Sequence, residues 1–188
     1  MNEKIERRAA DITAADEGNG NIVEGYAAVL EQPTVLYSID GVDYREVIDK
    51  DAFNGADMAD VVFKYNHSDN FFTLARTSNS TLTLTLDNYG LKIRADLADI
   101  ATGRDLYALI QRKDITKMSF AFTVARQEYD TNTRTRRILQ FEKIFDVSAV
   151  DMPAYDGTSI SARDYFAEKI KAEKLEEEKR KLYIMTLL

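Results

Sequence analysis

The sequence has no cysteine and a single histidine, His67. Without cysteine the chain can form no disulfide, no thiolate metal site and no cysteine nucleophile. One histidine also excludes a histidine-rich zinc centre, and no carboxylates have the spacing of an EF-hand. Sites for Mg²⁺ or Ca²⁺ made of carboxylates alone stay open, but nothing in the sequence favours one. We predict neither a metal nor a cofactor.

Positive charge is in deficit. The chain has 25 Lys and Arg residues against 32 Asp and Glu residues, for a formal net charge of −7. Proteins that bind nucleic acid usually carry a basic face that releases counterions from phosphates. The most basic short stretch, Arg134, Arg136 and Arg137, is interpreted as the solvated tip of a hairpin. We therefore expect no nucleic-acid partner.

Long hydrophobic runs are missing as well. No apolar stretch approaches the roughly 18 residues needed to cross a bilayer, and residues 1–20 carry charges instead of an apolar segment. The sequence predicts neither a signal peptide nor a membrane anchor, and no membrane partner. A length of 188 residues, 45% of them hydrophobic and 30% charged, is typical of one well-cored soluble domain with an appendage.

What the sequence does contain is a series of strand patterns joined by turns. These patterns predict strands over residues 22–30, 34–48, 61–67, 82–86, 91–97, 115–128 and 137–150. Asp40-Gly41 predicts a hairpin turn within 34–48, and the stretch from Thr102 to Asp105 predicts a capping box that opens a short helix. The expected fold class is mostly β with flanking helices.

Both ends of the chain differ from this β-rich part. Polar residues predict a flexible lead-in over 1–21, so the folded domain is expected over 22–160. Residues 161–188 are dense in Glu, Lys, Leu and Ala and predict a solvated helical tail. The tail ends in an apolar tip, and such a tip usually packs against something. This domain, a second copy of the chain in a homo-oligomer, and a partner protein all stay open as its contact.

Two segments carry a candidate base and a candidate nucleophile. His67 stands at the end of a predicted strand, and Ser119 lies between Met118 and Phe120, where a buried hydroxyl needs a partner. A serine is a weak nucleophile unless a base accepts its proton, and His67 is the only imidazole that can do so. A surface histidine and a serine bonded to its own backbone stay open as alternatives. No G-x-S-x-G motif occurs, which argues against an α/β-hydrolase.

A third segment, residues 141–154, places a carboxylate in apolar surroundings. Asp146 and Ser148 are expected on one face of a strand. Pro153 ends that strand and fixes a turn whose backbone N–H groups can face a nucleophile. An ordinary ion pair followed by an ordinary proline turn explains the pattern equally well.

Several stretches in order complete the pattern: GYAAV at 25–29, REVIDKDAF at 45–53, the pair Asn66-His67, LART at 74–77, YGL at 89–91, ITKMSFAF at 115–122 and DVSAVDMPA at 146–154. Together they resemble the HK97-type caudoviral prohead protease family, over about residues 22–160. The resemblance implies a β-barrel related to herpesvirus assemblin, flanked by helices. It also implies a serine endopeptidase that enters the procapsid in the host cytoplasm, trims scaffold and major capsid protein, and cuts itself.

The resemblance further implies the roles of single residues. His67 matches the catalytic histidine of the family and Ser119 its nucleophile. The herpesvirus relatives use a second histidine as the third member of the site, and this sequence has none. Asp146 stands where the family often has Glu and is the expected third member. Asp151 is the alternative. A non-catalytic capsid assembly or scaffolding protein that keeps the fold is the competing hypothesis.

Overall fold

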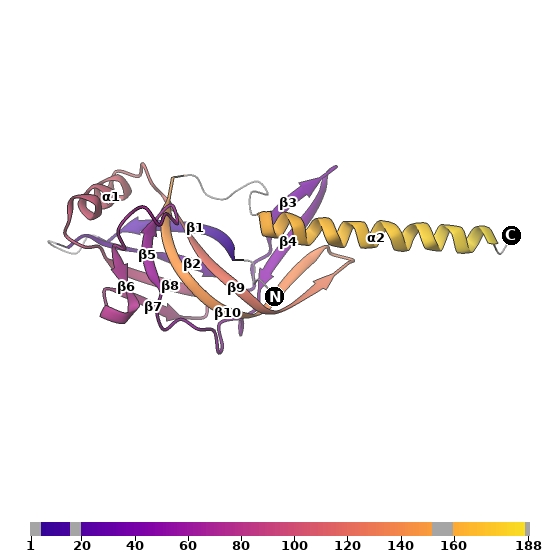
Figure 1. Cartoon of the computed structure of the whole chain (residues 1–188), viewed down its shortest axis with the longest axis horizontal. Coiled ribbons are helices and arrows are strands. Elements are labelled where there is room, and N and C mark those ends of the chain that lie inside the picture. Colours follow the sequence, from indigo (N-terminus) through magenta and orange to yellow (C-terminus); the bar gives the residue numbers. More distant parts are fainter. Residues whose placement is uncertain (1–4, 16–19, 152–159, 187–188) are drawn as a thin grey trace.

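The computed structural model describes residues 5–15, 20–151 and 160–186 (Figure 1). Its strands are β1 (Glu6–Ala14), β2 (Ile22–Val29), β3 (Thr34–Ile39), β4 (Val42–Ile48), β5 (Val62–Tyr65), β6 (Ala75–Arg76), β7 (Leu82–Leu86), β8 (Gly90–Asp96), β9 (Lys117–Asp130) and β10 (Thr135–Val150). A single 3-10 turn, η1 (Thr77–Asn79), follows β6. Helix α1 (Ala101–Gln111) separates β8 from β9, and α2 (Ile160–Thr186) follows β10.

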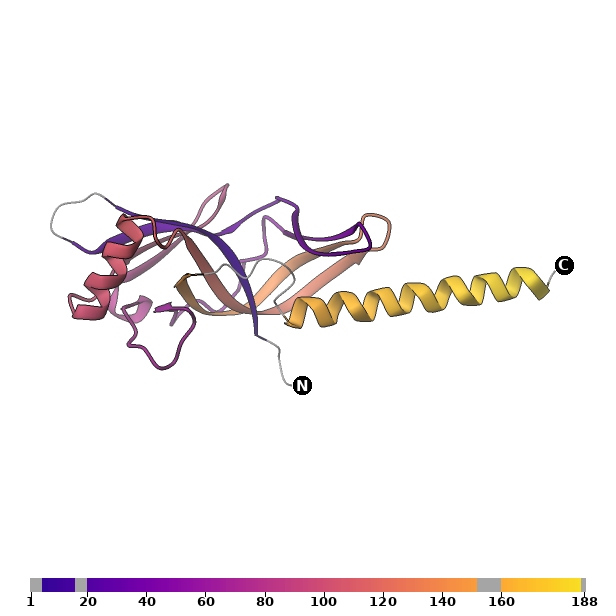
Figure 2. The same cartoon turned by 90° about the horizontal axis from the view of Figure 1, so that it is seen from above.

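All of these strands belong to one sheet. Its main path runs β3-β4-β10-β9-β1-β2-β8-β7, with β5 paired to β10 and β6 paired to β5. The partners β4 and β5 both run parallel to β10, and Figure 2 shows α2 projecting away from the strands. The predicted mostly-β class with a C-terminal helical tail is confirmed. Within the described residues β3 and β7 are the two ends of the path, so closure into a barrel stays a prediction.

Local sequence explains the hairpins. Asp40 and Gly41 turn β3 into β4 with φ angles of 51° and 77°, the positive values that a two-residue type I′ turn requires. The alternation in β7 places Leu82, Leu84 and Leu86 opposite Ala95, Ile93 and Leu91 of β8. The hairpins predicted over 34–48, 82–97 and 115–150 are confirmed.

Strand β1 corrects the flexible lead-in that was predicted over 1–21. Residues 6–14 form a strand inside the sheet, between β9 and β2. Its Ala9 lies opposite Ser119, and its Ile12 lies opposite Gly25. The sequence did not predict this strand, because a charged residue, Glu6, occupies one of its buried positions. Charged side chains are seldom buried unless they are paired with opposite charges.

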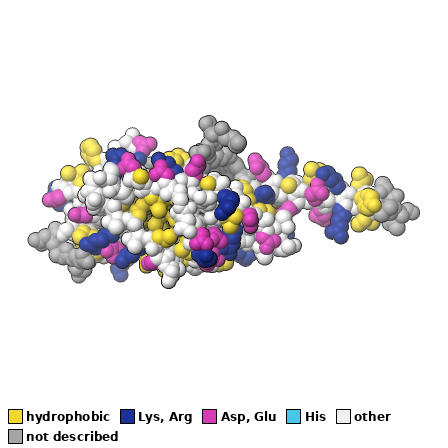
Figure 3. Space-filling view, turned by 90° about the horizontal axis from the view of Figure 1, so that it is seen from below, with side chains coloured by type: hydrophobic (Ala, Val, Ile, Leu, Met, Phe, Trp, Pro, Cys, Tyr) yellow, Lys and Arg dark blue, Asp and Glu magenta, His cyan; other side chains and the backbone are white. Residues whose placement is uncertain are grey.

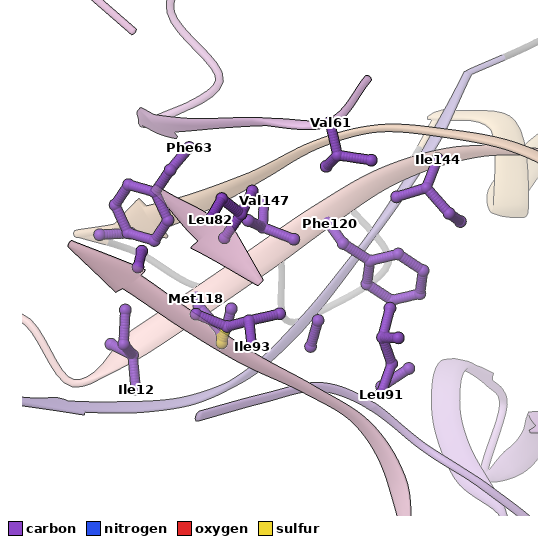
Figure 4. Close-up of a cluster of buried hydrophobic side chains, with 14 of the residues drawn as sticks. Ile12, Val61, Phe63, Leu82, Leu91, Ile93, Met118, Phe120, Ile144 and Val147 are labelled. Carbon is purple, nitrogen blue, oxygen red and sulfur yellow. The ribbon is translucent and has the colours of Figure 1, made fainter. Parts of the chain in front are cut away.

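The hydrophobic core lies on one face of β9 and β10 (Figure 4). Met118, Phe120 and Phe122 are fully buried there, beside Ile144 and Val147 of β10. Residues 118–123 are all buried, so the opposite face of β9 is covered as well. A strand that is buried on both faces has a nearly continuous apolar sequence, which accounts for the stretch around Ser119.

The predicted capping box at Thr102 is wrong. Helix α1 begins at Ala101, so its N-cap is Ile100 instead of Thr102, and Ile100 makes no side-chain capping bond. A Cβ at Gly103 would lie 2.0 Å from the carbonyl oxygen of Ala98. The start of helix α1 is therefore set by close packing of its backbone against the preceding loop, and not by a side-chain cap.

Helix α2 contacts the sheet through its first turns. Phe166 is completely buried, with its ring centroid 5.4 Å from that of Tyr44 and 6.2 Å from that of Tyr129. Farther along, Figure 3 shows charges of both signs and then hydrophobic side chains, which belong to the exposed residues Leu182, Tyr183, Ile184 and Met185. The solvated-tail prediction therefore holds for the far part of α2 and is wrong for Phe166.

None of the described helices is both long and apolar enough to span a membrane.

A cluster of four charged side chains lies beneath the docked end of α2. Arg136, which is 1% exposed, donates to the two oxygens of Glu6 at 2.6 and 2.7 Å, and the ring of Tyr165 lies 4.7 Å from its guanidinium carbon. Arg8 donates to Glu46 through two bonds of 2.6 Å. Arg136 is therefore not part of a solvated hairpin tip, because β10 carries it under the helix, where two glutamates balance its charge.

Replacing Arg136 with methionine is expected to lower the free energy of unfolding by about 3–5 kcal/mol, because it leaves two buried carboxylates, Glu6 and Glu46, with Arg8 as their one cation in the cluster. Urea denaturation of the full chain measures this. Arg137→Met is the matched control, since Arg137 is 37% exposed where it pairs with Glu31, and such a pair is worth at most about 1 kcal/mol. Equal losses in the two variants would contradict the prediction.

Lowering the pH is expected to reduce the stability that the same cluster contributes. Burial alone would raise the pKa of Glu6, but the hydrogen bond from Arg136 and the charges of Arg8 and Arg136 outweigh it and lower that pKa. A carboxyl whose pKa is lower in the folded state stabilises the fold above its unfolded pKa, about 4.3 for Glu. This contribution is lost as the pH falls from there through the folded pKa, and the loss should be absent in Glu6→Gln.

Candidate active site

Three neighbouring strands bring the candidate residues to one face of the sheet, opposite the core. Ser148 of β10 lies between Ser119 of β9 and Lys64 of β5. Residues directly opposite each other in a sheet place their side chains on the same face, with Cβ atoms about 4.5–5.5 Å apart in an antiparallel pair. Ser119 and Ser148 therefore share the face that points away from Phe120 and Val147.

A β-bulge in β10 puts Asp146 on this face as well. Ile144 lies opposite Phe122 in the core, yet Asp146, two residues later, lies opposite Ala121 on the other face, because the register shifts between them. In a regular strand residues two apart point the same way. The extra residue, Phe145, re-aims the carboxylate, as bulges near active sites often do.

His67 and Asp146 are in direct contact. Nδ1 of His67 lies 2.5 Å from Oδ1 of Asp146, and the two side chains are 10% and 11% exposed. An ionised carboxylate only accepts hydrogen bonds, so Nδ1–H is the donor and the lone pair of the ring is left on Nε2. Ser148 Oγ donates to the same carboxylate oxygen at 2.9 Å and fixes its position.

Two of the atoms that chemistry would require are buried without a hydrogen-bond partner. In the described part of the chain such side-chain atoms are His67 Nε2, Ser119 Oγ and Thr123 Oγ1. Most buried polar atoms in folded proteins are bonded, so each exception calls for a reason. Ser119 and His67 are not bonded to each other here, and catalytic hydrogen bonds are often loose until substrate is bound.

Asn66 and His67 contact β10 on either side of Ser148. The backbone N–H of Asn66 donates to the carbonyl of Ala149, while the ring of His67 reaches back to Asp146. Ser148, which lies opposite Ser119 in the sheet, comes between Asp146 and Ala149 on β10. The arrangement brings together a hydroxyl, an imidazole and a carboxylate, the three groups of an acyl-transfer site.

Asp151, the alternative third member, has different partners. Its carboxylate accepts from Tyr65 Oη at 2.5 Å and from Asn66 Nδ2 at 2.8 Å, and no bond to His67 is found among the described residues. Pro153, the expected source of N–H groups for an oxyanion, lies outside the described residues.

Sequence reasoning did not identify Ser148, Asn66 and Tyr65 as contributors to the site. For Ser148 the available signal was its shared face with Asp146. Among the described residues, no group of three or more His, Cys, Asp or Glu side chains is arranged to hold a metal ion.

Comparison with known proteins identifies the family of the chain. The family model of the caudovirus prohead serine protease matches residues 4–176 of the chain. No curated protein and no solved structure matches the chain. Since the match spans nearly all of the 188 residues, the chain belongs to the caudovirus prohead serine protease family.

Proposed function

We propose that this chain is a serine endopeptidase that cuts the scaffold and major capsid protein of a tailed phage, and its own chain, during procapsid maturation. In this proposal Ser119 is the nucleophile, His67 the general base and Asp146 the residue that orients His67. The work takes place inside the procapsid, in the host cytoplasm, and requires no cofactor, nucleic acid or membrane.

The observation that carries the proposal is the contact between His67 Nδ1 and Asp146 Oδ1 at 2.5 Å. It leaves Nε2 as the basic nitrogen on the face that also carries the unpartnered hydroxyl of Ser119. His67 takes the proton of Ser119 as Oγ attacks the peptide carbonyl, and Asp146 stabilises the imidazolium that forms. His67 then gives the proton to the leaving amine, and water releases the acyl group by the same steps.

Co-expression with scaffold and major capsid protein, followed by intact-mass measurement of all products, tests the proposal. We expect truncated capsid protein and scaffold with the wild-type chain and full-length proteins with Ser119→Ala. A shortened form of the chain itself, present only in the wild type, would support self-cleavage. Assembly of capsid shells without any truncation would instead favour a non-catalytic scaffolding protein that keeps the fold.

A further inference from the structure

The turn that carries His67 adopts an unusual backbone conformation. Asn66 and His67 follow each other with φ angles of 53° and 52°. Two successive residues with side chains rarely adopt this left-handed conformation, and they persist in it only where the surrounding structure holds them. The position of the imidazole therefore depends on whatever holds this turn.

Asp151 and Asn66 hold the turn through a reciprocal pair of hydrogen bonds. Asn66 Nδ2 donates to Asp151 Oδ2 at 2.8 Å, and the backbone N–H of Asp151 donates to Asn66 Oδ1 at 3.1 Å. The backbone N–H of Asn66 donates to the carbonyl of Ala149 at 2.9 Å. Three bonds thus tie a single residue to the end of β10, directly before His67.

Tyr65 completes the arrangement. Its hydroxyl donates to the second carboxylate oxygen of Asp151 at 2.5 Å, and its ring meets that of Phe71 edge-on at 5.6 Å. The bond to Asp151, with burial, raises the pKa of Tyr65, so the phenol stays protonated and able to donate. The carbonyl of Tyr65 also accepts from the N–H of Ser68, which closes the turn around His67.

We propose that Asp151 is a positioning residue that, through Asn66 and Tyr65, clamps the left-handed turn and so aims His67 at Ser119. This inference rests on the proposed function. It divides two tasks between two carboxylates: Asp146 sets the tautomer and angle of the ring, and Asp151 sets the place of the backbone from which the ring projects. The clamp also explains why Asn stands before His67, since Asn tolerates a positive φ and supplies both a donor and an acceptor.

Kinetics of the full chain on a peptide or capsid substrate test the clamp. Asp151→Ala is expected to lower kcat about 10–100-fold with KM unchanged, because a small displacement of a catalytic group costs rate and not substrate binding. Asp151→Asn should restore most of the rate, since its amide oxygen can still accept one of the two bonds. A rise in KM with kcat unchanged would overturn the proposal and assign Asp151 to substrate binding.

The variant Asn66→Gly distinguishes the effect of losing the side-chain hydrogen bonds from the effect of straining the backbone. Glycine adopts a positive φ freely, so the variant keeps the turn accessible and loses only the side-chain bonds. A fall in kcat similar to that of Asp151→Ala supports the clamp, and wild-type kcat in Asn66→Gly overturns it. The matched control is Asp87→Ala, which removes another Asp–Tyr bond, to Tyr26 at 2.7 Å, in the turn between β7 and β8. That variant should keep the wild-type kcat.

NMR of the imidazole gives a readout that does not depend on activity. His67 is the only histidine, so its ¹⁵N signals need no assignment. We expect one protonated Nδ1 tautomer in the wild type, and averaged or broadened signals in Asp151→Ala. Unchanged signals in that variant would sink the clamp even if the wild type is an active protease. A changed spectrum in a chain that cleaves nothing would keep the clamp and refute the proposed function.

Discussion

Ser119→Ala and His67→Ala are each expected to abolish cleavage of capsid protein, and the double variant is expected to be no worse than either single one. Residues that act as one catalytic unit are strongly non-additive, and removing one member of such a unit costs on the order of 10⁶-fold in turnover. In the proposed mechanism, the hydroxyl of Ser119 attacks only if His67 takes its proton. Intact-mass analysis of substrate after incubation with each purified variant measures the effect.

The structure offers a matched control on the same strand. Thr123 Oγ1 is, like Ser119 Oγ, a buried hydroxyl of β9 without a hydrogen-bond partner. Thr123→Val should therefore leave cleavage intact, because Ser119, and not Thr123, lies opposite Ser148, which bonds to the carboxylate of Asp146. Neither Ser119→Ala nor Thr123→Val breaks a hydrogen bond, so neither should lower the melting temperature. Cleavage by folded Ser119→Ala at the wild-type rate would rule out Ser119 as the nucleophile.

Asp146→Asn is expected to lower kcat by roughly 10²–10⁴-fold while the chain still folds, the range for neutralising the acid of a triad. Where the NH₂ group of the new amide faces Nδ1, it donates a hydrogen bond to that nitrogen, which favours the tautomer whose Nε2 is already protonated. His67 then cannot take the proton of Ser119. The same substitution removes the charge that stabilises the imidazolium. Steady-state kinetics on a short peptide, with circular dichroism to verify folding, measure both properties.

Two other variants are expected to lower kcat less than Asp146→Asn does. Ser148→Ala removes one hydrogen bond to the carboxylate and leaves the contact with His67, so its loss in kcat should be about tenfold, the size of a single hydrogen bond to a charged group. Asp151→Asn should likewise cost much less than Asp146→Asn. A larger loss in Asp151→Asn would transfer the orienting role to Asp151, and no loss in either would leave a bare Ser–His pair.

The local features of this fold could be predicted from the sequence alone. Asp40-Gly41, the alternation over 82–97 and the apolar run around Ser119 each encode a structure within a few residues of the chain, and the predicted hairpins formed. The candidate residues His67, Ser119 and Asp146 were also chosen from local surroundings and ordered motifs. Turn chemistry and hydrophobic periodicity act between near neighbours, so they survive without knowledge of the rest of the fold.

Only the tertiary structure decided which distant residues meet. His67 and Asp146 are 79 positions apart, and no local pattern predicted their contact or the register shift between Ile144 and Asp146. Arg136 looked like a solvated surface charge and is buried, because Glu6, 130 positions away, bonds to it in the sheet. Charges and strand registers of this kind are fixed by partners far along the chain, so their environments exist only once the strands have assembled.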